Sequence, residues 1–233
     1  MKGAVMGAGC VGSVLAAHYY EENRDGVRLV AVGERASRLE ERGITVNGRQ
    51  YRIPLAGEDD AEKPGLLFMC VKNYDLEQAC REVRPFIGRE TVILPLLNSV
   101  SPTPVIQGAF PENRVLYGYI GKIDSHREGD GFRYNIAGEL HFGDADNRTT
   151  DSTLERIREG MEAAGLNAII DKDMIRGIWK KWMLNIGANQ VSALTGADYL
   201  QFAAIPEIEK VLRLSMHELL VIACYENVSL STD

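Results

Sequence analysis

The hydrophobic residues of the first hundred positions fall into short, nearly continuous runs, which predicts strands that are buried on both faces. Such runs differ from the alternating pattern of a strand with one face in water. The segments between successive runs are long enough for a helix or a hairpin, so the pattern predicts the parallel sheet of an α/β fold. The four runs are Gly3–Met6, Val27–Val32, Leu66–Val71 and Thr91–Leu97.

Alternation of apolar and polar residues appears in two further places and predicts two β-hairpins. The segment Ile44–Ile53 alternates on both sides of Asn47-Gly48, and Asn-Gly is the preferred pair for a tight hairpin turn. We interpret this hairpin as a surface excursion. The segment Phe132–Phe142 alternates on both sides of Ala137-Gly138, so we expect a second hairpin there and a sheet that is mixed at its far edge.

The last third of the chain reads as mostly helical. Ser152–Glu155 has the form of a capping box, and the helix that it starts runs towards Met161 and stops at Gly165. Asn167–Asp171 then reads as a last strand. Two long helical stretches follow, at Asp173–Leu194 and Ile205–Asn227, with breaks around Gly196 and Pro206. We therefore predict an α/β domain over residues 1–170 and an all-α domain over residues 171–233.

A glycine-rich turn joins the first strand to a helix of small residues. In a Rossmann turn the first glycine permits the bend, the second lets the backbone approach a pyrophosphate, and the third lets helix and strand pack closely. The pyrophosphate binds at the positive end of the helix dipole. The alternative, a turn used only for packing, does not explain the glycine spacing. We expect a dinucleotide to be bound by Gly7, Ala8, Gly9, Cys10, Val11 and Gly12.

The residues after the second strand should contact the adenosine ribose of that dinucleotide. At this position an acidic residue binds the 2′-hydroxyl of NAD, whereas a basic residue accommodates the 2′-phosphate of NADP. The segment offers Glu34 for NAD and Arg35, Ser37 and Arg38 for NADP, and all four could equally be solvated residues at the start of a helix. The sequence leaves the choice open.

Composition and charge exclude several classes of function. The chain has 45% hydrophobic and 25% charged residues and a formal net charge of −7, which argues against a nucleic-acid partner because phosphate binding needs clustered Lys and Arg. The longest apolar runs have the length of strands and fall short of the roughly 20 residues that span a membrane. The first strand begins at residue 3, leaving no room for a signal peptide, so we expect a cytoplasmic protein without a membrane partner.

The cysteines are widely spaced and lack Cys-x-x-Cys pairs, which argues against a zinc site and against a disulfide framework. We expect no metal site and four buried thiols. Cys10 starts a helix, where a thiolate could be stabilised for redox chemistry, but we prefer a small filler beside the cofactor. The four are Cys10, Cys70, Cys80 and Cys224.

Polar side chains recur every four residues along the first long helix, at Lys181, Asn185 and Asn189. Steps of four drift only about 40° around a helix, so the three lie on one face of an otherwise apolar helix. A solvated stripe is the simpler reading, but such stripes usually carry more Glu, Lys and Arg. Asparagine is a poor interior helix former, which favours a ligand-binding role for these side chains.

Four signatures together resemble the ketopantoate reductase family, and the resemblance runs over essentially the whole chain. The signatures are Gly7–Gly12, then Val71-Lys72-Asn73-Tyr74-Asp75, then Asn98 after the fourth strand, and Trp179-x-Lys181 with Asn185 and Asn189. The resemblance implies a Rossmann domain followed by a helical domain like that of 6-phosphogluconate dehydrogenase, with the active site in the cleft. It also implies the NADPH-dependent reduction of 2-dehydropantoate, a small 2-keto acid, to pantoate on the way to coenzyme A.

The resemblance also implies roles for individual residues. Lys181 would be the general acid, and Asn185 and Asn189 would bind polar groups of the substrate. Asn98 and Lys72 would lie near the nicotinamide and the reacting carbonyl, although composition suggests only a loop cap and a surface lysine. Two alternatives stay open: a related 2-keto acid reductase, and a regulatory protein that binds a dinucleotide without catalysis.

The chain departs from the family pattern at three places. Val32 stands where the family has an arginine, so Arg35 or Arg38 would have to bind the 2′-phosphate of NADP, and Ser99 stands where the family has a glycine. The chain also lacks the C-terminal serine and glutamate that bind substrate in the family. We therefore expect a truncated helical domain, whose exposed apolar surface a second copy could cover to form a homodimer.

Overall fold

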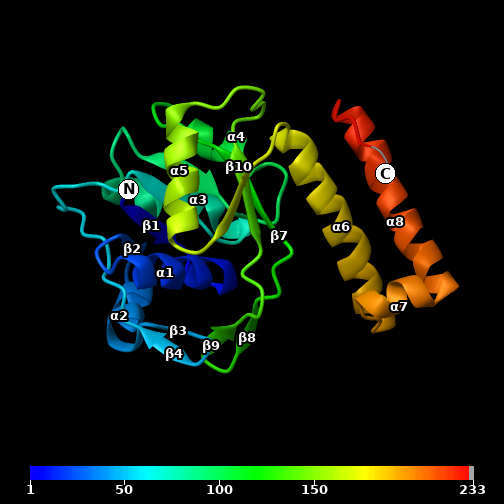
Figure 1. Ribbon diagram of the computed structural model, residues 1–233, viewed down its shortest axis with the longest axis horizontal. Coiled ribbons are helices and arrows are strands. Elements are labelled where there is room, and N and C mark those ends of the chain that lie inside the picture. Colours follow the sequence, from blue (N-terminus) through cyan, green and yellow to red (C-terminus); the bar gives the residue numbers. More distant parts are fainter. Residues whose placement is uncertain (231–233) are drawn as a thin grey trace. The chain divides into compact units, whose positions relative to one another are not determined.

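The computed structural model describes residues 1–230 and divides the chain into two compact units, Met1–Met174 and Ile175–Asp233 (Figure 1). The first unit combines strands and helices, and the second is entirely helical within the described residues. An α/β unit followed by an all-α unit is the fold class that the sequence predicts.

A four-stranded parallel sheet forms the centre of the first unit. The order is β2-β1-β5-β6, and β1 pairs in register with β2 from Gly3 opposite Val27. All four predicted strands are confirmed. The first has the predicted bounds, the second and third end two residues before their apolar runs do, and the fourth is shorter than its run at both ends. They are β1 (Gly3–Met6), β2 (Val27–Val30), β5 (Leu66–Met69) and β6 (Val92–Pro95).

Helices cover both faces of this sheet, which explains why its strands are apolar throughout. Val5 packs into the same core as residues of α1, whereas its neighbours Ala4 and Met6 pack into a second core with residues of α3 and α4. Two short 3₁₀ turns, Asn73–Asp75 and Arg84–Phe86, flank α3. The helices are α1 (Cys10–Glu22), α2 (Glu34–Arg42), α3 (Leu76–Val83) and α4 (Pro102–Ala109).

The first predicted hairpin is confirmed, but it is not a surface excursion. Its strands β3 (Ile44–Val46) and β4 (Arg49–Tyr51) are antiparallel, and Asn47 and Gly48 both have positive φ, as the tight turn requires. Ile44, Val46 and Tyr51 are buried in the core shared with α1. β3 also pairs with β9 (Gly131–Arg133), giving a second four-stranded sheet in the order β4-β3-β9-β8.

The second predicted hairpin, over Phe132–Phe142, is wrong. Phe132 lies in β9, which pairs with β8 (His126–Glu128) around Gly129. Phe142 lies in β10 (Glu139–Gly143), which belongs to a different sheet. The segment between them is a connection, because the Asp124 carboxylate accepts the backbone N–H groups of Asn135 and Ile136 at 2.8 Å and holds them away from any strand partner.

The third sheet is mixed, but it is separate from the parallel sheet, whose far edge the sequence predicts to be mixed. β10 runs antiparallel to β7 (Tyr117–Gly121) and parallel to β11 (Asn167–Ile170). The helix before β11 is α5 (Ser152–Ala163), and Gly165 follows it with φ +73°, as expected for a glycine that ends a helix. The N-cap is Asp151 rather than Ser152, because the Asp151 carboxylate accepts the N–H groups of Thr153 and Leu154 at 3.0 Å.

A hydrogen-bond network fixes the chain where it leaves β11. The Asp171 carboxylate accepts the hydroxyl of Tyr119 at 2.7 Å and lies 2.9 Å from Nδ1 of His141, whose ring stacks on that of Tyr119. Burial alone would raise the pKa of Asp171, but these hydrogen bonds outweigh it and lower that pKa. Asn147 donates to the backbone oxygen of Asp171 at 2.7 Å. The end of β11 is thereby tied to its neighbour β10 and to β7, the strand beyond it.

The second unit consists of the helices α6 (Met174–Thr195), α7 (Tyr199–Ala204) and α8 (Pro206–Tyr225). The first residue of α6, Met174, still belongs to the first unit. Both predicted helices are confirmed, with breaks at Gly196 and Pro206, whereas α7 was not predicted. Ala188, Val191, Ala197 and Phe202 form a small core. Gly187 lets α6 approach α8 closely, because a Cβ there would lie 2.8 Å from Cγ of Met216.

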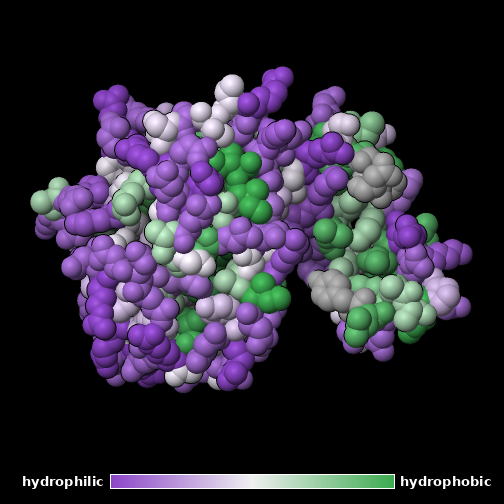
Figure 2. Space-filling view, viewed as in Figure 1, coloured by the Kyte–Doolittle hydropathy of each residue, from purple (hydrophilic) through white to green (hydrophobic). Residues whose placement is uncertain are grey.

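Apolar side chains are also exposed on the second unit, where Figure 2 shows green patches. On α8 the exposed fraction reaches 58% for Leu214 and 83% for Tyr225. A homodimer would cover such a surface, and it stays a prediction.

Candidate functional site

The glycine turn lies at the carboxyl end of β1, the central strand of the sheet. Gly7, Ala8 and Gly9 form the turn, and Cys10, Val11 and Gly12 form the first turn of α1. The first N–H groups of a helix have no acceptor within the helix, and Gly9 as N-cap has no side chain to offer them. Together with the positive end of the helix dipole, they form a site for an anion.

The three glycines of the turn are required for different reasons. Gly7 has φ +101°, and a Cβ there would lie 2.7 Å from the backbone oxygen of Cys70. A Cβ at Gly12 would lie only 2.0 Å from the backbone oxygen of Gly7, so Gly12 lets α1 pack on the turn. The fold itself therefore requires a glycine at both positions.

Gly9 differs, because the described part of the chain gives no reason for a glycine there. Its backbone angles, φ −87° and ψ −165°, suit any residue. A Cβ at Gly9 would meet no atom of the described residues within 4 Å. The space that a side chain would fill is open in front of the helix N-terminus, where a pyrophosphate must approach the backbone. The turn thus fits a dinucleotide.

The other residues predicted to contact the cofactor lie at the same edge of the sheet. Arg35 is the second residue of α2, shortly after β2, while Lys72 follows β5 and Asn98 follows β6. The strands are parallel neighbours, so their carboxyl ends meet at one edge, which is where open α/β sheets bind ligands. Lys72 and Asn98 are both exposed.

Arg35 is paired with Glu82, a residue that no sequence pattern distinguishes. Its guanidinium Nη2 lies 3.5 Å from Oε1 of Glu82, which belongs to α3. Glu34, the preceding residue, is exposed. One basic and two acidic side chains therefore belong to the region where the adenosine ribose is expected.

The predicted catalytic residues gather on one helix of the second unit. Lys181, Asn185 and Asn189 occupy successive turns of α6, which is unbroken from Met174 to Thr195. Lys181 and Asn185 are half-buried and Asn189 is exposed. Burial lowers the pKa of Lys181 from its ordinary value of 10.5. A lysine with a lowered pKa releases its proton more readily, as a general acid requires.

The cysteines are free thiols, but they are not all buried. Cys80 is buried, Cys10 and Cys70 are half-buried, and Cys224 is exposed, which corrects the expectation of four buried thiols. Burial raises the pKa of Cys70, which keeps its thiol protonated.

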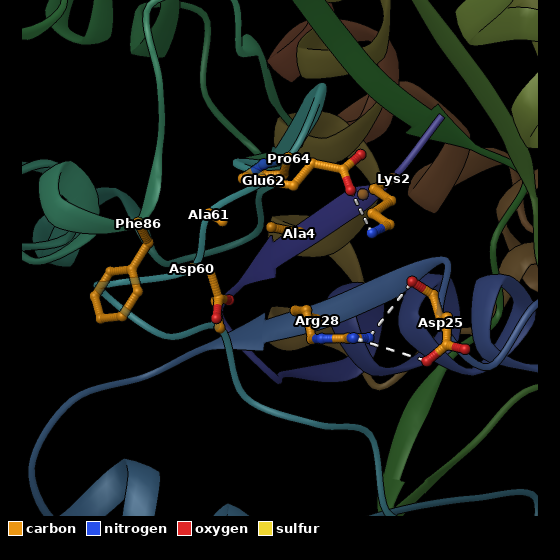
Figure 3. A pocket seen from close by; sticks show the side chains of 11 residues that line it. Lys2, Ala4, Asp25, Arg28, Asp60, Ala61, Glu62, Pro64 and Phe86 are labelled. Atoms are coloured by element: carbon orange, nitrogen blue, oxygen red, sulfur yellow. Dashed lines mark hydrogen bonds and ion pairs between the residues drawn. The ribbon is translucent and has the colours of Figure 1, made fainter.

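A polar pocket of about 200 Å³ lies at the opposite edge of the sheet (Figure 3). Its lining includes Gly3 and Ala4 at the amino end of β1, and Arg28 near the start of β2. Ion pairs between Lys2 and Glu62 at 2.6 Å and between Arg28 and Asp25 at 3.8 Å border it. Because ligands of such sheets bind at the carboxyl ends of the strands, this pocket is not the dinucleotide site.

The structure describes residues 1–230, and within this range it has neither a candidate metal site nor a candidate membrane span. No cluster of three or more His, Cys, Asp or Glu side chains in this range could hold a metal ion. Within the same range, every helix is too short or too polar to cross a membrane.

A doubly covered parallel sheet, a glycine turn open to a pyrophosphate and a separate helical unit define a Rossmann-type dinucleotide-binding oxidoreductase. The chain belongs to the ketopantoate reductase PanE/ApbA family: the family model matches residues 4–147, and the model of the family's C-terminal part matches residues 173–233.

Individual relatives are distant in sequence and close in fold. The 2-dehydropantoate 2-reductase of Streptococcus pyogenes serotype M6 is 24% identical over 234 residues, covering 98% of this chain and 76% of the relative. A PanE/ApbA family ketopantoate reductase of Ralstonia eutropha JMP134 superposes with a TM-score of 0.80 at 24% identity, over 100% of this chain and 77% of the other. A D-mandelate dehydrogenase in complex with NADH and anilino(oxo)acetate superposes with a TM-score of 0.85 at 19% identity, over 99% and 76%.

Proposed function

We propose that the chain reduces a 2-keto acid with a nicotinamide dinucleotide, and that its substrate is 2-dehydropantoate and its cofactor NADPH. The observation that carries the proposal is the open space at Gly9 in front of the N-terminus of α1, which leaves room for a pyrophosphate beside the free N–H groups of the helix. Membership of the ketopantoate reductase family supports the reaction, and the name of the Streptococcus pyogenes relative supports the substrate.

The proposed chemistry assigns different roles to the cofactor and to Lys181. When bound, the cofactor supplies a hydride to the keto carbon of the substrate. Negative charge then grows on the carbonyl oxygen, and Lys181 stabilises this charge and donates the proton. The lowered pKa of Lys181 brings its proton affinity closer to neutral pH, where a general acid is most effective.

The uncharged polar groups are suited to bind the rest of the substrate. Asn185 and Asn189 can each donate and accept hydrogen bonds, so they can hold the hydroxyl group of the substrate without adding a charge that would change the pKa of Lys181. We assign Asn98 and Lys72, at the carboxyl edge of the sheet, to the nicotinamide and the reacting carbonyl. Lys72 would add a second positive charge there.

We assign the 2′-phosphate of NADPH to Arg35, because an arginine shortly after the second strand can bind it with two parallel hydrogen bonds. The chain should therefore bind NADPH more tightly than NADH. Titration of each reduced cofactor against the fluorescence of Trp179 and Trp182 measures both dissociation constants. Equal affinities, or tighter binding of NADH, would contradict NADPH as the cofactor.

A further inference from the structure

The Arg35 guanidinium is engaged by a carboxylate that is held more firmly than the arginine itself. Glu82 is 13% exposed in its side chain, whereas Arg35 is 53% exposed. Oε1 of Glu82 also accepts a hydrogen bond from Nε2 of Gln78 at 2.9 Å. Gln78 in turn accepts two hydrogen bonds from Arg81 on the same helix. The carboxylate is thus held on α3 by its neighbours, and Arg35 is the more exposed partner of the pair.

A 2′-phosphate at this edge would have to compete with Glu82 for Arg35. A phosphate monoester carries about −1.5 to −2 charges at neutral pH, so the carboxylates of Glu82 and Glu34 repel it. Arg35 must leave Glu82, or share its N–H groups with it, to bind the phosphate. The 2′-hydroxyl of NADH carries no charge, and it needs nothing from Arg35.

We propose that Glu82 is a specificity-determining residue that acts through Arg35 and limits the preference for NADPH over NADH. The inference rests on the proposed function, because it takes the dinucleotide to bind at the glycine turn with its ribose near Arg35. Glu82 contacts Arg35 rather than the cofactor, so it should change the ratio of the two affinities and leave the hydride transfer itself unchanged.

The variant Glu82→Gln tests this directly. Glutamine has nearly the same shape and still offers an oxygen to Gln78, but it lacks the charge that holds Arg35. The dissociation constant for NADPH should fall about three- to fivefold, as expected for the loss of one exposed ion pair, while that for NADH stays unchanged. The matched control is Glu77→Gln, which removes the same charge from an exposed position on the same helix.

A double-mutant cycle shows whether the effect passes through Arg35. In an Arg35→Ala background, Glu82→Gln should change the ratio of the NADPH and NADH dissociation constants much less, because only the direct repulsion between Glu82 and the phosphate is then removed. Three results would overturn the role of Glu82. They are no change in the ratio when Glu82→Gln is made in the unmodified chain, an equal change when it is made in the Arg35→Ala background, and a change by the same factor from Glu77→Gln. If the unmodified chain binds neither dinucleotide, the proposed function itself fails. The two failures are therefore distinguishable.

Discussion

Replacing Lys181 by alanine should lower kcat for keto acid reduction by about 10²- to 10⁴-fold, which is the usual contribution of a positioned general acid. This loss corresponds to roughly 3 to 5.5 kcal/mol of activation free energy. The dissociation constant of the cofactor should change little, because we propose that backbone groups of Gly7–Gly12 in the first unit bind the pyrophosphate. Steady-state kinetics and a fluorescence titration of the same variant separate the two effects.

The dependence of kcat on pH gives this prediction a second signature. Lys181 acts in its protonated form, so kcat should be highest at low pH and fall as the pH rises through the pKa of Lys181, which burial places below 10.5. Lys180→Ala is the control, because a shift of one position turns the side chain about 100° away from the face of Asn185 and Asn189. If Lys180→Ala is the more damaging variant, or Lys181→Ala reduces keto acids at the normal rate, this face of α6 is not catalytic.

Alanine at Gly9 and alanine at Gly12 should have opposite consequences for folding and binding. Gly9→Ala should leave the free energy of unfolding nearly unchanged, because its Cβ meets no atom of the described residues within 4 Å. The same Cβ would occupy the space of the pyrophosphate, so the dissociation constant of the cofactor should rise about ten- to a hundredfold, as for 1–3 kcal/mol of steric overlap. Calorimetry and cofactor titration measure the two quantities.

Gly12→Ala should instead destabilise the fold by about 3 kcal/mol, because its Cβ would overlap the backbone oxygen of Gly7 at 2.0 Å. Gly160→Ala on α5 is the control, since its Cβ also meets nothing within 4 Å among the described residues and lies far along the chain from the turn. That variant should leave the dissociation constant of the cofactor unchanged and should stabilise the fold by about 0.5–1 kcal/mol, as alanine does in place of glycine within a helix. Unchanged cofactor affinity in Gly9→Ala would show that the open space is not a ligand site.

The elements that could be predicted from the sequence are those whose pattern has a local cause. The four parallel strands are apolar throughout because helices cover both faces, and the turn at Asn47-Gly48 needs two residues that tolerate positive φ. The glycine turn at Gly7–Gly12 combines a bend, a close helix contact and a ligand approach within six residues. Each of these signals is complete within a short window of the chain.

The errors arose where contacts between distant residues decide the structure. The segment after Phe132 alternates like a strand, but the Asp124 carboxylate accepts the backbone N–H groups of that segment. Phe132 itself lies in β9, which pairs with β8. Ser152 and Glu155 have the sequence of a capping box, and only the geometry shows that the Asp151 carboxylate accepts the N–H groups at the start of the helix.

In the candidate site, too, the residues with a local sequence pattern could be predicted, and the contacts between distant residues could not. The residues of the turn and the face of α6 follow from spacing, which the backbone geometry preserves. The pair of Arg35 and Glu82 could not be predicted, because it joins helices that are far apart in the sequence. The difference between Gly9 and its two neighbouring glycines is likewise visible only in three dimensions, since it depends on which atoms surround each Cβ.

The most direct test of the central claim follows the transferred hydride. The chain is mixed with 2-dehydropantoate and with NADPH that carries deuterium at the transferable position of its nicotinamide ring, and the product is analysed by mass spectrometry and NMR. The account predicts pantoate with one deuterium at the carbon that was the keto carbon, formed in equal amount to the oxidised cofactor. Binding of NADPH without label transfer, to 2-dehydropantoate or to any of a panel of other 2-keto acids, would contradict it.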